Sequence, residues 1–333
     1  MSSTRYGSCR ARLAALVAFA ALAASGCAPS KPVASVRLGH AATLGVALDV
    51  IAEELGYFER EGLDVTLVQV ASGNVAVNGV LSGELDVAVA TIYPIVLASF
   101  SGDELRVFGS VSVSRNNNVI IARSDRGIAS IADLEGRKVG TLAGGNPEFV
   151  LGLMLLEGGV PSERVDIVKG ELAAMYERFA AGELDAIACF GIWVDRAESA
   201  HPGRTVVFMD EDIVRTTSAL AARKEALERD GPTYERLLRA LVRAEEYVRK
   251  YPDKAFELSV KALGIDAEQN RPLWYPDVYG VRLDQSIIRD MENMARWQID
   301  SGSAGSESMP DVLSLFDFRP LERIDAKRVT VIH

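Results

Sequence analysis

Residues 81–88 read LSGELDVA, and residues 180–187 repeat the pattern as AAGELDAI. In each copy a helix end meets a glycine that stops the helix, and a short turn then leads into a buried strand. Aromatic and turn-forming residues follow each copy, at 91–94 (TIYP) and at 190–193 (FGIW). Two similar βαβ units roughly a hundred residues apart predict two lobes of like topology. Because glycine-stopped helices are common in α/β proteins, the repeat alone indicates two lobes without proving them.

Strand-like and helix-like segments alternate around this repeat. Residues 36–39 predict a short strand, residues 47–60 place apolar side chains at helical spacing, and residues 63–67 alternate apolar and polar with period two. This βαβα order predicts parallel sheets with covering helices. Further strands are predicted at 85–90, 105–113, 119–122, 138–142, 165–168, 184–190 and 205–209. Further helices are predicted to begin near residues 74, 93, 147, 172, 193, 232, 253 and 284.

The composition is that of a globular protein long enough for two cores. The chain has 333 residues, of which 48% are hydrophobic and 25% charged. Its net charge of -10 becomes -13 if the N-terminal segment with Arg5, Arg10 and Arg12 is removed. An acidic surface repels phosphate backbones, which disfavours nucleic acid as a partner.

The N-terminus has the pattern of an export signal. Three arginines precede an apolar run at 13–24 that is too short to span a bilayer, which takes about 20 residues. Residues 24–27 (ASGC) resemble the lipobox of bacterial lipoproteins, which predicts a signal peptide at 1–26 and a lipid on Cys27. A plain cleaved signal peptide is the alternative. Residues 27–35 carry turn formers without periodicity and are predicted to be a tether.

Cysteine usage fits export but not a disulfide. Cys9 would be removed and Cys27 lipidated, which leaves Cys189 alone in the folded body. Cys189 lies in the apolar string at 184–190, which favours a small buried side chain over a reactive thiol.

The candidate binding residues follow the ends of five predicted strands. Ligands of open parallel sheets collect at the carboxyl ends of strands, where helix N-termini present unpaired N–H groups. Glycine, hydroxyl and amide residues suit an anion held by backbone donors, and the aromatic residues suit an apolar wall. The predicted ligand-binding residues are His40, Ala41, Thr43, Ser72, Gly73, Asn74, Thr91, Tyr93, Gly144, Gly145, Asn146, Phe190 and Trp193.

Several of these residues also have a purely structural explanation. Ser72 and Asn74 are equally plain helix caps, and His40 is equally a satisfied, partly buried histidine. His201 and His333 are interpreted as surface or terminal residues. The sequence shows no metal-ligand spacing of His or Cys, no G-x-S-x-G, no Walker A and no dinucleotide G-x-G-x-x-G, and residues 210–212 (DED) fit a solvated turn. No catalytic residue, metal or cofactor is predicted.

Four segments together resemble the type II periplasmic solute-binding proteins. They are residues 54–65 (ELGYFEREGLDV), 81–88 (LSGELDVA), 131–140 (IADLEGRKVG) and 181–186 (AGELDA). The resemblance is to the family that includes the nitrate, aliphatic sulfonate, taurine and thiamine-precursor receptors of ABC importers. It implies an α/β fold of two lobes with a ligand cleft between them.

The resemblance also implies how the lobes are assembled and what they bind to. Residues 36–115 and 218–333 would form the first lobe and residues 116–217 the second, with crossings near 112–118 and 210–217. The implied protein is a monomeric, non-enzymatic lipoprotein on the periplasmic or extracellular face. It would deliver a small solute to a permease and its ATPase.

The solute itself stays open at this stage. A sulfonate- or nitrate-like anion is predicted, although the five loops contain no arginine for a bidentate clamp. A pyrimidine or other aromatic solute stacked between Tyr93 and Trp193 is the alternative. Relatives often carry Trp-Glu-Pro where this chain has Trp193-Val194-Asp195, so the usual lining is altered here.

Two rival functions belong to other classes. Fungal pyrimidine synthases resemble this family but carry a cysteine-rich motif, of which Cys189 supplies a single cysteine. An export signal also argues against that cytosolic chemistry. A sensor that signals to a membrane receptor would have the same lobes, and only a neighbouring permease gene would distinguish it.

Overall fold

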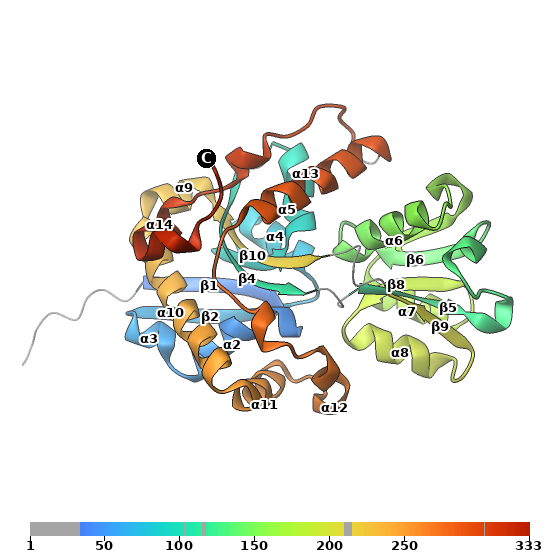
Figure 1. Cartoon of the computed structure of the whole chain (residues 1–333), viewed down its shortest axis with the longest axis horizontal. Helices are drawn as coiled ribbons and strands as arrows, with labels where there is room; N and C mark the ends of the chain where they lie inside the picture. The colour runs from blue at the N-terminus through green and yellow to red at the C-terminus, as the bar shows by residue number, and fades with distance from the viewer. Residues whose placement is uncertain (1–33, 103, 115–117, 210–214, 303) are drawn as a thin grey trace, which may run out of the picture. The chain divides into compact units, whose positions relative to one another are not determined.

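The computed structural model describes residues 34–333 except 103, 115–117, 210–214 and 303. Two five-stranded sheets organise this part of the chain (Figure 1). The predicted signal peptide, Cys27, the greater part of the tether and residues 210–212 lie outside the described residues. Strand β1 already begins at Ala34, so the last two residues of the predicted tether are part of a sheet.

The first sheet has the strand order β2-β1-β3-β10-β4. Its strands are β1 (Ala34–Ala41), β2 (Leu63–Val70), β3 (Val87–Thr91), β4 (Leu105–Ser114) and β10 (Thr216–Arg223). Strands β1 and β3 are parallel, with Gly39 opposite Ala88, whereas β10 runs antiparallel to both of its neighbours.

The second sheet repeats this plan with the order β7-β6-β8-β5-β9. Its strands are β5 (Asn118–Arg123), β6 (Lys138–Leu142), β7 (Asp166–Gly170), β8 (Ala186–Phe190) and β9 (Thr205–Phe208). Strands β6, β7 and β8 are parallel, and β5 is antiparallel to β8 and β9. Each sheet thus has one strand that runs antiparallel to both of its neighbours, β10 in the first sheet and β5 in the second. The chain passes into that strand when it changes sheets.

The chain changes sheets twice, after β4 and after β9. Thr216 and Thr217, which the sequence analysis assigned to the second lobe, are paired with β4 in the first sheet. Both sheets belong to one compact unit, Ser35–His333.

The repeated GELD segment has the same structural role in each sheet. The backbone N–H of Arg37 on β1 donates to Asp86 at 2.8 Å, and the backbone N–H of Lys138 on β6 donates to Asp185 at 2.9 Å. The leucine before each aspartate is buried, and its side chain lies over a glycine of the neighbouring strand, Leu85 over Gly39 and Leu184 over Gly140. A side chain on either glycine would collide with that leucine, so the leucine of the repeat packs closely on the neighbouring strand.

Helices cover the faces of each sheet (Figure 1). The helices of the first half are α2 (Ala47–Glu54), α3 (Tyr57–Arg60), α4 (Gly73–Ser82) and α5 (Ile92–Phe100), and those of the second sheet are α6 (Asn146–Glu157), α7 (Leu172–Ala180) and α8 (Ile192–Ala200). One helix had been predicted over residues 47–60, but Gly56 has φ +65° and separates α2 from α3. This left-handed backbone conformation suits glycine and ends a helix.

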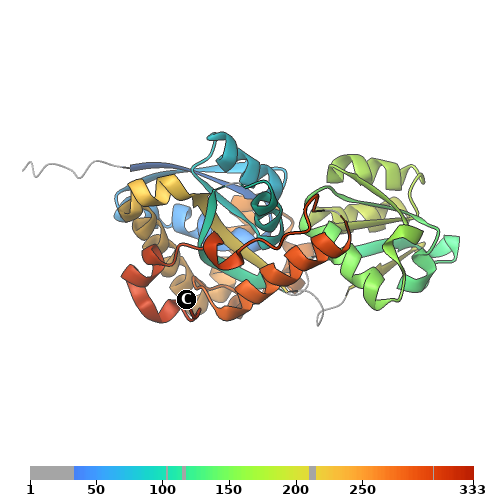
Figure 2. The ribbon, with the colours of Figure 1, turned by 90° about the horizontal axis from the view of Figure 1, so that it is seen from above.

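The last third of the chain is helical and returns to the first sheet. Its helices are α9 (Lys224–Arg229), α10 (Gly231–Lys250), α11 (Pro252–Leu263), α12 (Ala267–Asn270), α13 (Gln285–Asp300) and α14 (Arg319–Asp325). Helix α10 packs on α2, α3 and α14, and α13 lies against α5 (Figure 2). None of the described helices is both long and apolar enough to cross a bilayer.

Candidate functional site

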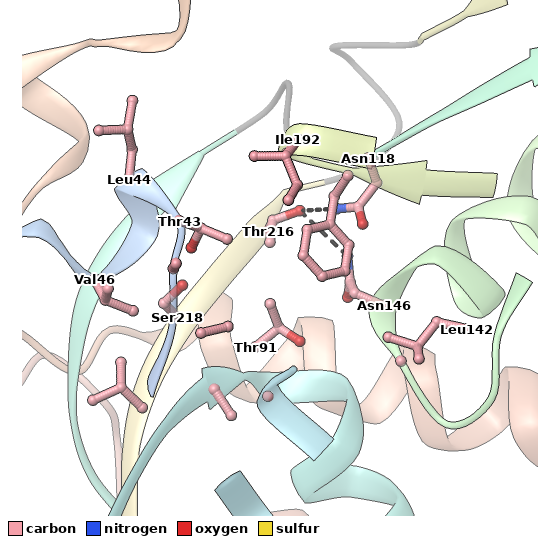
Figure 3. A pocket seen from close by; sticks show the side chains of 18 of the residues that line it. Thr43, Leu44, Val46, Thr91, Asn118, Leu142, Asn146, Ile192, Thr216 and Ser218 are labelled. Carbon is pink, nitrogen blue, oxygen red and sulfur yellow. Dashed lines mark hydrogen bonds between the residues drawn. The ribbon is translucent and has the colours of Figure 1, made fainter. Parts of the chain in front are cut away.

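A pocket of about 80 Å³ lies where loops from both sheets meet (Figure 3). One ordered water needs roughly 10–15 Å³ of such space, so the pocket has room for a compact solute. Its lining is formed by Ala41, Ala42, Thr43, Leu44, Val46, Gly73, Asn74, Val89, Ala90, Thr91, Pro94, Asn118, Leu142, Gly145, Asn146, Phe190, Gly191, Ile192, Thr216, Ser218, Ile265, Asn270 and Leu273.

The first sheet contributes the ends of β1 and β3 and the start of β10. Thr43 precedes the short 3₁₀ helix η1 (Leu44–Val46), and Thr91 precedes α5. Asn74 lies in the first turn of α4. Thr216 and Ser218 enter from β10 because its antiparallel course brings its first residues to the carboxyl end of β3, where Ser218 pairs with Thr91.

The second sheet contributes residues at its own strand ends and at the helix starts that follow them. Leu142 ends β6, Asn146 begins α6, and Phe190 ends β8. Asn118 opens β5 directly opposite Phe190. Gly191, with φ +56° and ψ -135°, turns the chain from β8 into α8 in a conformation that side chains other than glycine rarely adopt.

Four helices begin at this pocket without a side-chain cap. The N-cap residues of α4, α5, α6 and α8 are Ser72, Thr91, Gly145 and Gly191, and none of them forms a side-chain capping hydrogen bond. The first backbone N–H groups of a helix have no partner within it and carry partial positive charge. The first turns of these helices therefore present backbone N–H donors at the pocket, except at Pro94 and Pro147, which have none.

The lining of the pocket is mostly apolar, and its polar side chains are amides and hydroxyls. No Lys, Arg, His, Asp or Glu belongs to its lining among the residues that the structure describes. Amides of Asn118 and Asn146 donate to the hydroxyl of Thr216 at 3.1 and 3.4 Å, which joins the start of β5 and of α6 to β10 (Figure 3). The polar side chains of the described lining are therefore neutral dipoles.

Eight of the thirteen predicted residues belong to the lining. They are Ala41, Thr43, Gly73, Asn74, Thr91, Gly145, Asn146 and Phe190. The other five, His40, Ser72, Tyr93, Gly144 and Trp193, lie outside it.

His40 is a buried residue behind the pocket rather than a part of its surface. Its Nδ1 lies 3.5 Å from Oδ2 of Asp49 on α2, and both side chains are almost wholly buried. Burial, opposed by the neighbouring His40, raises the pKa of the Asp49 carboxyl. The alternating side-chain direction of a strand turns His40 away from the face that Ala41 presents.

Tyr93 belongs to an aromatic cluster next to the pocket. Its ring stacks on Phe149 of α6 at 5.5 Å between centroids and lies 6.2 Å from Trp297 of α13. Its hydroxyl accepts a hydrogen bond from the amide of Gln298. Burial, with a smaller contribution from the Glu148 carboxylate, raises the pKa of Tyr93, so the phenol stays neutral.

Ser72 and Gly144 support pocket residues from behind. The Ser72 hydroxyl donates to the side-chain oxygen of Asn74, whose amide donates to the carbonyl of Ala143 at 3.1 Å. The Gly144 N–H donates to Glu148 at 2.8 Å, and Glu148 also accepts from Lys169 at 2.6 Å. These contacts fix the loops after β2 and β6.

Trp193 faces helix α7 and not the pocket. Its ring lies 5.7 Å from that of Tyr176, and the Arg196 guanidinium lies over it at 4.9 Å. The preceding residue, Ile192, is the one that lines the pocket. A solute stacked between Tyr93 and Trp193 does not fit this arrangement.

The pocket residues that enter from distant parts of the chain were not among the predicted ones. Thr216 and Ser218 come from β10, and Asn270 and Leu273 come from the segment after α11. Asn118 could have been found, because it ends a predicted crossing immediately before the strand predicted at 119–122, although β5 itself begins at Asn118. The helical segment carried no comparable signal.

His201 was interpreted as a surface residue, and this was wrong. It is buried, with Nε2 lying 3.0 Å from the Arg123 guanidinium and 2.9 Å from the Phe179 carbonyl. Among the described residues no three His, Cys, Asp or Glu side chains form a group that could hold a metal. Cys189 is fully buried, and burial raises the pKa of its thiol, which opposes reactivity.

Comparison with known proteins identifies the family. Residues 45–255 match the family described as NMT1/THI5 like. The chain belongs to the NMT1/THI5-like family. A relative from Brucella abortus, whose name describes a binding protein, is 25% identical over 297 residues, which cover 85% of this chain and 91% of the relative.

Solved structures show how widely the fold of this NMT1/THI5-like chain is shared. The alkanesulfonate-binding protein SsuA from Xanthomonas axonopodis pv. citri, bound to MOPS, has a TM-score of 0.73 at 18% identity. That match covers 84% of this chain and 97% of SsuA. The desulfurization enzyme DSZB has a TM-score of 0.63 at 14% identity, covering 88% and 99%. The chain thus has the periplasmic-binding-protein fold predicted for it, a fold that occurs in binders and enzymes alike.

Proposed function

We propose that this protein is the extracytoplasmic solute-binding protein of an ABC importer. The observation that carries the proposal is a single pocket lined by strand ends from two like-built sheets. A pocket at that position takes ligands in open α/β sheets. The names of the Brucella relative and of SsuA support binding as the function.

Capture would occur by movement of the two sheet-and-helix halves about their connections. A solute that contacts both Thr43 and Asn146 binds best when the two halves are close together, so it shifts the population toward the closed form. The permease, driven by its ATPase, would recognise that closed form. Delivery then needs no chemistry from the binding protein.

Anchoring and location form a finer part of the proposal. A signal peptide over residues 1–26 and a lipid on Cys27 would hold a monomer at the membrane, on the periplasmic or extracellular face. The support is the sequence pattern of positive charge, apolar run and small residues before Cys27. Metabolic labelling with a radioactive fatty acid should mark the wild-type chain and not Cys27→Ala.

The predicted sulfonate- or nitrate-like solute has support from two sides. SsuA is by name an alkanesulfonate-binding protein. The four uncapped helix N-termini at the pocket favour negative charge. An aromatic solute such as a pyrimidine would instead use the ring of Phe190.

An enzymatic role has weaker support from the residues. DSZB shares the fold, but the pocket described here contains no nucleophile with an adjacent base. Cys189 is buried and lies outside the lining. Turnover of a solute by the purified protein alone would favour the enzyme.

The test is ligand-dependent compaction. A thermal-shift screen of sulfonates, nitrate, bicarbonate, aromatic acids and pyrimidines would supply the strongest binder, because a bound solute stabilises the folded chain. Small-angle scattering at saturation should then show a smaller radius of gyration than without solute. No change in radius would contradict capture by closure.

A further inference from the structure

Two buried carbonyl oxygens at the pocket have no hydrogen-bond partner among the described residues. They are Oδ1 of Asn118 and Oδ1 of Asn146. Both residues line the pocket, and they are only 8% and 4% exposed. Buried side-chain acceptors are nearly always hydrogen-bonded in folded proteins. The two oxygens therefore indicate a molecule that donates hydrogen bonds to them.

The hydroxyl of Thr216 limits how the two amides can be oriented. Both Asn118 and Asn146 direct Nδ2 at its oxygen. A hydroxyl has a single proton, so at most one of the two amides could be turned over to accept from Thr216. At least one carbonyl oxygen remains without a partner in either arrangement.

The other two asparagines of the pocket are already engaged. Asn74 donates to the Ala143 carbonyl and accepts from Ser72. Asn270 donates to the Asp266 carbonyl at 2.8 Å. The unmet acceptors are thus specific to the place where β5, α6 and β10 come together.

A simple anion cannot satisfy these acceptors. Nitrate, sulfonates and carboxylates carry acceptors alone, and their charge is repelled by carbonyl oxygens. The described lining also supplies no cationic side chain to offset that repulsion. A solute with both N–H donors and a carbonyl or sulfonyl acceptor would satisfy Asn118 and Asn146 and the uncapped helix N-termini together.

We propose that the solute is a compact, uncharged molecule of the amide or urea class. Its N–H groups donate to Oδ1 of Asn118 and Asn146, and its acceptor oxygen binds N–H and hydroxyl groups on the opposite wall. This inference rests on the proposed solute-binding function, and it replaces the sulfonate- or nitrate-like anion with a neutral class of solute. A pocket of about 80 Å³ suits molecules of a few heavy atoms.

Three isosteric pairs of probes separate this class from anions. They are urea with nitrate, acetamide with acetate, and methanesulfonamide with methanesulfonate. Calorimetric titration of the purified full chain, at millimolar probe and constant ionic strength, should show binding of the neutral member of each pair. The anionic member should bind at least about tenfold more weakly, since it leaves the buried acceptors unmet.

Substitutions locate the effect at the two amides. Asn118→Leu and Asn146→Leu should each weaken binding of the neutral probes about tenfold or more, whereas Asn78→Leu, at an exposed position of α4, should not. Asn118→Asp keeps an acceptor oxygen and adds charge, so it should gain affinity for acetamidinium, the cationic isostere of acetamide. This gain remains informative even if a leucine variant fails to fold.

The outcomes distinguish this inference from the proposed function. Binding of the anions in preference to their neutral partners overturns the inference and leaves a solute-binding protein. Absence of binding by all six probes also overturns it, because the class is then wrong at any useful affinity. Compaction with another solute would still support capture by closure.

Discussion

Two clusters lie at the starts of helices α5 and α6, yet one is a buried aromatic contact and the other a pocket that contains polar side chains. The aromatic cluster joins Tyr93 of α5, Phe149 of α6 and Trp297 of α13. The pocket lies beside it, with Thr91 before α5 and Asn146 at the start of α6. Residues two or three positions apart therefore serve different purposes.

Helix geometry explains the division. Each residue of an α-helix is turned by about 100° from the one before, so a side chain two positions further on faces the other way. Ile192 and Trp193 diverge in this manner by a single step of α8, whereas Thr91 still belongs to β3 and Tyr93 to α5. Strand ends determine where loops converge, whereas the helical turn determines which side chains line the cavity.

The largest expected effect is a loss of stability when the aromatic cluster is broken. Phe149→Ala removes a buried ring and should lower the free energy of unfolding by about 3–5 kcal/mol. Leu156→Ala on the same helix is the matched control, because Leu156 is 69% exposed and should change stability by less than about 0.5 kcal/mol. Urea denaturation followed by circular dichroism measures both. Equal effects would mean that the cluster does not contribute to stability as a packed core does.

The next largest effect concerns solute affinity and Phe190, whose ring lines the pocket. Phe190→Ala should weaken binding of the strongest solute by about 1–2 kcal/mol, or roughly five- to thirtyfold, because apolar contact with the ring is lost. Isothermal titration calorimetry measures the change. If the affinity stays within twofold, Phe190 does not contact the solute and the polar side chains carry recognition alone.

A pH-dependent effect tests the buried pair behind the pocket. The folded chain holds the Asp49 proton more tightly than the unfolded chain, because burial raises the pKa above the usual 3.8. Its contribution to stability is present below that value and declines as the pH rises toward the raised pKa, by up to about 1.4 kcal/mol per pH unit.

Asp49→Asn should remove this contribution to the pH dependence of the free energy of unfolding. Urea unfolding of both proteins from pH 4 upward isolates it, since other titrating groups are common to the two chains. The wild-type chain should lose stability relative to the variant as the pH rises. Parallel curves would mean that Asp49 titrates alike in both states.

The sequence predicted the fold through patterns that depend on near neighbours. The GELD repeat at 81–88 and 180–187 indicated two like halves because a glycine stop and a following leucine and aspartate act locally, on the strand alongside. The break at Gly56 was missed because the apolar spacing continues through it.

The pocket could be predicted only in part. Loops after β1, β2, β3, β6 and β8 each contribute to the pocket lining, because parallel strands of a sheet end at the same edge. Thr216 was missed because its position depends on pairing with β4, a hundred residues earlier in the chain. Tyr93 was misassigned since aromatic character does not distinguish a pocket wall from a core.

The smallest expected effect is that of Trp193 on solute affinity, and it tests most directly which side chains line the pocket. Trp193 was among the predicted binding residues, and a ring buried against the solute would make Trp193→Ala weaken binding by about 1–3 kcal/mol. The structure places its ring against Tyr176 and Arg196 instead. Solute affinity should therefore change less than twofold, whereas the melting temperature should fall because α8 loses its contact with α7. Titration and a thermal melt of the same preparation separate these quantities. A large loss of affinity with an unchanged melting temperature would return Trp193 to the solute and show that the two halves close further around it.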